Sequence, residues 1–138
     1  MTSGFREAIR ARAAARPRRI AFPETTDPRM AEAIAVLLRE RLAEPVPVGP
    51  RDEVRDALAS HGVEPDALAA LDPRDDLEAA AEALLEARPG RIGRNEALAR
   101  AADPLMHAVL AVRRGVVDGC VAGAVHTTAD VLRAALHG

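Results

Sequence analysis

Val116–Leu136 reads VVDGCVAGAVHTTADVLRAAL, and it predicts a strand, a turn and a helix in that order. Val116–Ala122 is a short apolar run of the kind that forms a buried strand. Gly123–His126 follows as a turn of small residues, and Thr127 and Asp130 have the spacing of a capping box at a helix start. Such a turn aims free backbone N–H groups and the positive end of the helix dipole at one point. We therefore predict an anion site at this turn.

Helices and strands alternate along the rest of the chain. We expect helices from Ser3 to about Arg16, from Asp27-Pro28, over Pro50–His61, from Asp75 or Asp76 to Pro89, over Glu96–Ala101, and from Asp103-Pro104 to Gly115. We expect strands over Arg19–Phe22, Pro45–Val48 and Leu68–Leu71. The prolines of the second strand place it at an edge of the sheet or at a strand end. The alternation predicts an α/β fold in which a parallel sheet carries helices on both faces.

The first helix is rich in arginine. The first 19 residues hold six Arg and one Glu, a balance that is also typical of transit peptides. However, Phe5, Ile9 and Ala13 follow helical spacing and a strand comes directly afterwards. We therefore expect a first helix that docks on the domain through this apolar stripe.

Composition limits the class of protein. The chain has 138 residues, which is enough for one domain with its own core. The formal net charge of −2 gives no reason to expect nucleic acid or an anionic membrane as a partner. No apolar run has membrane-spanning length. The single cysteine, Cys120, excludes an internal disulfide and fits a reducing cytoplasm, so we predict a cytoplasmic protein.

Several residues near the turn are candidates for anion binding. Arg133 lies on the helix that follows the turn, where a guanidinium could pair with a phosphate; the alternative is an arginine solvated on the helix surface. Thr127 and Thr128 can cap the helix, contact the anion, or do both. His126 can donate to a ligand oxygen or serve only as a hydrogen-bonded spacer.

Two other residues carry alternative interpretations. Glu24 follows the first strand, where ligands gather in parallel sheets, but it could equally be a solvated carboxylate of a turn. Cys120 could form a thioester, but its apolar strand favours an unreactive thiol. The spacing of His, Cys and acidic residues predicts no metal site. The glycine patterns of nucleotide-binding loops are also absent from the sequence.

Three segments together resemble the phosphate acetyltransferase/phosphate butyryltransferase family. They are RIAFPETTDPRMAEAIAVLL from Arg19, LEARPGRIGRNEALARAADPLMHAVLAVRRGVVDG from Leu85, and VDGCVAGAVHTTADVLRAAL from Val117. The resemblance implies the reaction of acetyl-CoA with phosphate to give acetyl phosphate and CoA, or the butyryl equivalent. It also implies a fold like part of the isocitrate/isopropylmalate dehydrogenases. It further implies that residues 1–138 are the amino-terminal part of a longer domain.

The resemblance also assigns roles. Arg133, Thr127, Thr128, His126 and Arg88 would bind substrate, whereas the family's catalytic Arg and Asp would lie beyond Gly138. CoA and acetyl-CoA would be substrates, with no bound cofactor, and the small-molecule partners would be phosphate, acetyl phosphate and CoA. The chain would then self-associate or need a partner that supplies the missing half. The alternatives are a regulatory or binding module, like the acyltransferase-like region of malic enzymes, and an inactive truncated product.

Overall fold

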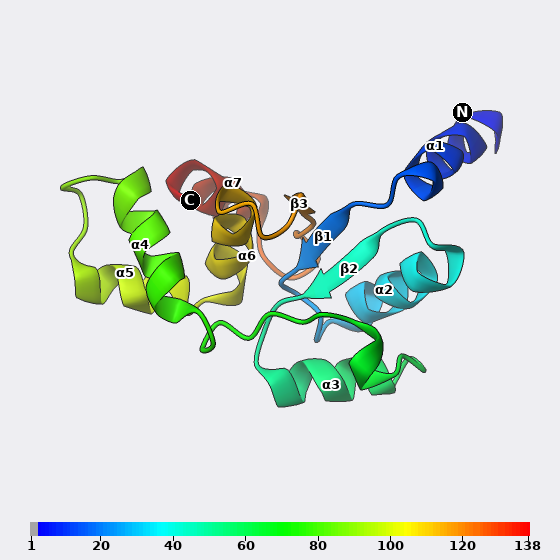
Figure 1. Cartoon of the computed structure of the whole chain (residues 1–138), viewed down its shortest axis with the longest axis horizontal. Coiled ribbons are helices and arrows are strands. Elements are labelled where there is room, and N and C mark those ends of the chain that lie inside the picture. The colour runs from blue at the N-terminus through cyan, green and yellow to red at the C-terminus, as the bar shows by residue number, and fades with distance from the viewer. Residues whose placement is uncertain (1–2) are drawn as a thin grey trace.

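A three-stranded parallel sheet forms the centre of the protein (Figure 1). The computed structural model describes residues 3–138. Strand β1 (Arg19–Phe22) lies in the middle, between β2 (Glu44–Pro47) and β3 (Gly119–Cys120). Ala21 of β1 is in register with Val46 on one side and Cys120 on the other. The predicted parallel sheet is therefore confirmed, with β2 at an edge as its prolines indicated.

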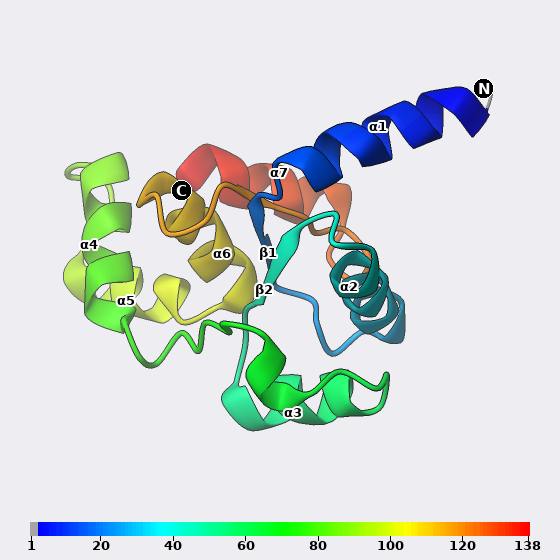
Figure 2. The same cartoon turned by 45° about the vertical axis from the view of Figure 1, so that its right-hand side comes forward.

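Helices cover both faces of this sheet, as the alternation predicted (Figure 2). Helices α2 (Pro28–Glu40) and α3 (Arg51–Ala59) pack on Phe22 and Ile20 of β1. Helix α6 (Pro104–Arg113) packs on Ala21, which points to the opposite face. Successive residues of a strand alternate between the two faces, so Ile20 and Phe22 belong to one core and Ala21 to the other.

A helical layer adjoins α6 on its far side. It consists of α4 (Leu77–Ala87), α5 (Arg94–Ala101) and α7 (Thr128–His137), which share an apolar core with α6 built largely from alanine and leucine. Asp76, the residue before α4, makes no side-chain capping bond. Its carboxylate instead binds Arg114 at 2.7 Å and lies 2.9 Å from His107 Nε2, so it ties α4 to α6.

The helix starts predicted from Asp-Pro pairs are confirmed. Asp27 accepts the Arg29 backbone N–H at 2.9 Å, and Asp103 accepts that of Met106 at 3.1 Å. Each carboxylate satisfies an N–H group that has no partner within its own helix. The proline that follows is compatible with the first helical turn because it needs no such partner.

Some predicted boundaries differ from the structure. The predicted strand Leu68–Leu71 is reduced to one parallel bridge, between Leu71 and Val48, and it follows a short 3-10 helix, η1 (Pro65–Ala67). Strand β2 begins one residue earlier than predicted, and α3 is shorter than the predicted Pro50–His61. Helix α5 begins two residues earlier, at Arg94.

The predicted buried strand Val116–Ala122 is wrong in length and in burial. Only Gly119–Cys120 pairs as a strand, and both residues are half-buried. Val117 is buried, but the side chain of Val121 is 46% exposed. Within residues 3–138, β3 has a strand neighbour on one side only, which is β1. The apolar run therefore lies at an edge of the sheet rather than in its interior.

The first helix, α1 (Ser3–Ala15), also departs from the prediction, because it does not dock. Figures 1 and 2 show it projecting away from the sheet. Phe5 is 52% exposed and Ile9 50% exposed, although both lie on the predicted apolar stripe. Its ion pair is between Arg10 and Glu40, at 2.8 Å. Ala13, the third residue of the stripe, is half-buried, so only the part of the helix nearest the sheet is partly covered. Across residues 3–138, every helix is too short or too polar to cross a lipid bilayer.

Candidate anion-binding site

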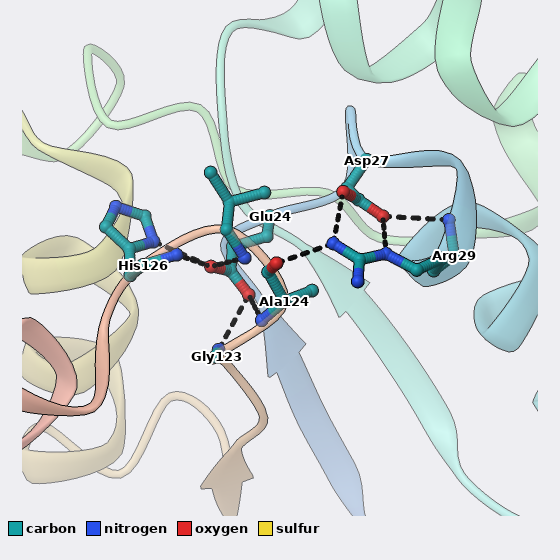
Figure 3. A network of polar contacts seen from close by, with 7 residues as sticks. Glu24, Asp27, Arg29, Gly123, Ala124 and His126 are labelled. Atoms are coloured by element: carbon teal, nitrogen blue, oxygen red, sulfur yellow. Dashed lines mark hydrogen bonds and ion pairs between the residues drawn. The ribbon is translucent and has the colours of Figure 1, made fainter.

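The turn after β3 wraps around the carboxylate of Glu24 (Figure 3). Glu24 Oε1 accepts the backbone N–H groups of Gly123 at 2.8 Å and Ala124 at 2.9 Å. Oε2 accepts those of Val125 at 2.9 Å and His126 at 2.7 Å. The His126 ring adds a fifth contact, from Nδ1 to Oε2 at 2.8 Å. Four consecutive amides and one imidazole thus surround a single carboxylate, an arrangement that we call the Glu24 clamp.

The clamp strongly favours the ionised carboxylate. Glu24 is only 3% exposed, and burial by itself would raise its pKa. The hydrogen bonds from His126, Val125 and Ala124 outweigh burial and lower the pKa of Glu24 to about 2. Because the carboxylate is an acceptor at neutral pH, His126 Nδ1 must be the protonated ring nitrogen that donates to it.

Arg29 holds the same turn from the other side. Its guanidinium makes a paired contact with Asp27, at 3.0 Å from Nε and 3.0 Å from Nη2. Nη2 also donates to the backbone oxygen of Ala124 at 2.5 Å (Figure 3). The segment between β1 and α2 therefore fixes both the N–H groups and a carbonyl of the turn.

These contacts correct two interpretations of the sequence. The turn does bind an anion, but that anion is the protein's own Glu24, so an external phosphate would have to displace it from the amides of residues 123–126. Glu24 is neither a solvated carboxylate nor free to contact a ligand. Its nearly complete burial and five hydrogen bonds give it a structural role.

The helix after the turn begins as predicted. Thr127 Oγ1 accepts the Asp130 backbone N–H at 3.1 Å, so Thr127 is the cap of α7. Thr127 and Thr128 are both exposed. Neither threonine lines the nearest surface hollow, which lies farther along α7.

This surface hollow has a volume of about 250 Å³ and a largely basic wall, and we call it the basic hollow. Its titratable wall residues are Arg100, Asp103, His126, Asp130, Arg133 and His137. Arg133, predicted as the main anion ligand, is exposed and lies 3.4 Å from Asp130. Arg100 Nη2 is 3.3 Å from His137 Nδ1. Asp103 is occupied in capping α6.

Arg88 faces the same region from the end of α4. Burial is the main reason why the pKa of His137 lies below its usual value, and the positive charges of Arg88, Arg100 and Arg133 lower it further. Arg88 Nε is buried without a hydrogen-bond partner among the described residues. The fold therefore gathers Arg88 and Arg133, which the sequence singled out, around one imidazole together with Arg100.

Sequence reasoning missed Arg100 and His137. Each is an isolated basic residue on a helix, and neither has a motif spacing to distinguish it. The clamp role of Glu24 did have a signal, because an acidic residue directly after a strand could meet a small-residue turn after a neighbouring strand. The sequence does not say which strands are neighbours. Glu24 can therefore be matched to the turn after β3 only once the order β2-β1-β3 is known.

Cys120 carries an unreactive thiol, as its apolar surroundings indicated. Burial, with a smaller contribution from the Glu24 carboxylate, raises the pKa of the thiol to about 11. The thiolate is therefore scarce at neutral pH, and the nucleophilic form of a cysteine is the thiolate. The structure thus gives no support to a covalent thioester at this position.

Comparisons with known proteins identify the family of this chain. The family model described as phosphate acetyl/butaryl transferase matches residues 4–137. The phosphate acetyltransferase of Acetivibrio thermocellus is 33% identical over 133 residues, which cover 96% of this chain and 40% of that protein. That of Bacillus subtilis is 29% identical over 120 residues, covering 86% of this chain and 37% of that protein.

A solved structure gives the same result. The crystal structure of a phosphotransacetylase from Streptococcus pyogenes superposes with a TM-score of 0.92 at 32% identity, covering 99% of this chain and 43% of that one. The chain thus spans about two fifths of the length of these three proteins. Sequence and structure agree that the chain belongs to the phosphate acetyl/butaryl transferase family.

Proposed function

We propose that this chain provides the anion- and CoA-binding part of a phosphate acyltransferase. The reaction would be acetyl-CoA plus phosphate giving acetyl phosphate plus CoA, as the names of its relatives suggest. The observation that carries the proposal is the hollow that Arg100, Arg133 and His137 share, in a chain of this family. Arg88 adds a positive charge near His137. Every reactant pair of this reaction includes a phosphate group, and guanidinium groups bind phosphate through strong charge-assisted hydrogen bonds.

The proposed role of these residues is to bind and neutralise charge. In the direction of acetyl-CoA formation, the CoA thiolate attacks the carbonyl carbon of acetyl phosphate, the new C–S bond forms, and the C–O bond to phosphate breaks. The departing phosphate carries away the electron pair. Positive groups held near the phosphate stabilise that charge. Arg133 and Arg88 are the proposed ligands, with the hydroxyls of Thr127 and Thr128 as further donors. Because Nδ1 of His126 donates to Glu24, its Nε2 would donate to a phosphate only from the doubly protonated ring.

We assign no acid–base group to this part of the protein. Cys120 is neutral at pH 7, Glu24 is enclosed by the turn, and His126 Nδ1 is committed to Glu24. The group that deprotonates the CoA thiol would then be the Asp that family resemblance places beyond Gly138. CoA acts as a substrate in this scheme, so the proposal requires no bound cofactor.

We also propose the finer expectations from the sequence. These are a single, incomplete domain over residues 1–138, a fold akin to part of the isocitrate/isopropylmalate dehydrogenases, and a cytoplasmic location. A partner or second copy would contribute the remaining groups. The exposed side chains of Leu132 and Leu136, one turn apart on α7, support this last point, since neighbouring exposed apolar side chains are typical of contact surfaces.

Binding and turnover test the proposal separately. Titration calorimetry would measure the affinity of the purified chain for CoA and for acetyl phosphate. We expect Arg133→Gln to weaken binding about tenfold or more, the range for losing a hydrogen bond to a charged group. Arg39→Gln, which removes an exposed arginine on α2, is the matched control and should bind normally. Thioester formation from acetyl phosphate and CoA measures turnover. Absence of any CoA or acetyl phosphate binding would refute the proposed function.

A further inference from the structure

The basic hollow combines basic side chains from two helices, α5 and α7, with few compensating acids. Arg100 comes from α5, and Arg133 and His137 come from α7, one turn apart on the same helix. Arg88 adds its charge from the end of α4. The two acidic wall residues are both engaged, Asp103 with the Met106 N–H and Asp130 with Arg133. Like charges held together at a partly buried position disfavour one another unless an anion lies between them.

The side chains of the basic hollow determine whether the His137 ring is protonated. Arg100 points a donor nitrogen at His137 Nδ1 from 3.3 Å, which suits a neutral ring whose Nδ1 accepts. Burial and the three arginine charges favour the same neutral form. The groups that face the ring also include Asp103, His126 and Asp130 in the basic hollow, and Arg113 and Cys120 in the adjoining apolar hollow. A dianion bound among the arginines would offset their positive charge. It would then favour the protonated, positively charged form of the His137 ring.

We propose that Arg100, Arg133 and His137 together bind one phosphoryl dianion in the basic hollow, and that His137 takes up a proton as the anion binds. The proposal rests on the proposed function and deepens it, because it adds two ligands and a pH dependence. The anion would gain two guanidinium contacts and one imidazolium contact. Its affinity would then rise as the pH falls, by up to tenfold per pH unit while the free ring is neutral and the bound ring is charged.

Sulfate is the probe, because it is a dianion of phosphate shape that does not itself titrate between pH 5 and 8. Calorimetry of the full chain at constant ionic strength, in buffers of different ionisation enthalpy, would report the protons taken up per sulfate bound. We expect uptake approaching one proton, and an affinity that falls as pH rises. His137→Gln should abolish both effects while leaving weaker binding, and Arg100→Gln should lower affinity about tenfold or more.

Two matched controls separate this role from a structural one. His61→Gln, on the connection after α3, should keep the full proton uptake, and Arg39→Gln should keep the affinity. Competition then identifies the source of the phosphoryl group. Displacement of sulfate by CoA but not by dephospho-CoA would indicate the 3′-phosphate, and displacement by acetyl phosphate would indicate the reacting group. Either result supports the site. If the chain binds CoA and acetyl phosphate but neither displaces sulfate, the inference is overturned, because the basic hollow then receives neither phosphoryl group.

The inference and the proposed function can fail independently. No sulfate binding, or binding unchanged in both Arg100→Gln and His137→Gln, would overturn the inference even if acyl transfer were observed. Proton uptake that survives in His137→Gln would overturn the role of that ring. Conversely, proton-linked sulfate binding without any affinity for CoA or acetyl phosphate would leave the inference standing and refute the acyltransferase role.

Discussion

Replacing Glu24 by glutamine tests the clamp most directly. Glutamine has nearly the same shape, but its side chain keeps one acceptor oxygen and turns the other into an N–H donor. In the Glu24 clamp, Oε2 accepts from Val125 N–H, His126 N–H and His126 Nδ1. An amide nitrogen at that position would face three donors, and buried donors without acceptors each cost about 1 to 3 kcal/mol. We therefore expect Glu24→Gln to destabilise the fold by at least about 3 kcal/mol at pH 7.

The pKa of Glu24 gives an independent magnitude. The fall of this pKa from 4.5 to about 2 is equivalent to about 3 kcal/mol of stability at neutral pH. A carboxyl whose pKa is lowered on folding stabilises the protein above its unfolded pKa. That stabilisation is lost as the pH falls through about 4.5 toward 2. This is a large share of the roughly 5–15 kcal/mol that is typical of a folded domain.

Urea unfolding from pH 7 to pH 2 would measure the effect. The difference in unfolding free energy between the parent chain and Glu24→Gln should be largest at pH 7 and shrink by about 3 kcal/mol on acidification. Glu32→Gln, at an exposed position on α2, is the control and should stay within about 0.5 kcal/mol of the parent. If Glu24→Gln unfolds within about 1 kcal/mol of the parent at pH 7, with the amides of residues 123–126 still protected from exchange, the reasoning is refuted.

Three further predictions concern other parts of the fold. Asp103→Ala should lower the unfolding free energy by about 1 kcal/mol, since it removes the side-chain cap of α6; an unchanged urea midpoint would argue against the cap. Asp72→Asn should destabilise the chain at pH 7 and less so in acid, because the Arg74 side chain lowers the pKa of this buried carboxyl; a difference independent of pH would contradict that account. Cys120 should react with iodoacetamide at pH 8 at least tenfold more slowly than a free cysteine, as followed by mass spectrometry, and rapid labelling of the folded chain would exclude its raised pKa.

Local signals in the sequence predicted local structure well. Asp27, Asp103 and Thr127 each precede a helix, and each one caps that helix with its side chain. A capping residue acts within four residues of itself, so its neighbours in the sequence contain the needed information. The strand Arg19–Phe22 was also predicted at its observed bounds, because apolar residues lie between clear breaks at Pro17 and Pro23.

Predictions that depended on distant partners were less accurate. The run Val116–Ala122 is apolar enough for an interior strand, but burial also needs a neighbour on each side, and β3 has β1 alone among the described residues. The stripe of α1 likewise identified a helix without identifying a surface to receive it. The basic hollow combines residues from three helices, so no single segment could reveal it. Arg88 was found through resemblance to a family, whereas Arg133 was found both from its position after the turn and from that resemblance.

The Glu24 clamp also has a consequence for the order of folding. It joins residues that lie 99 to 102 positions apart in the chain, so nearly the whole polypeptide must be arranged before its bonds can close. Closing so long a loop costs entropy that no local contact offsets beforehand. The bonds of the clamp should therefore form after the folding transition state, and their loss should chiefly accelerate unfolding. The Glu24 carboxylate should therefore affect the unfolding rate of the native turn and α7 more than their folding rate.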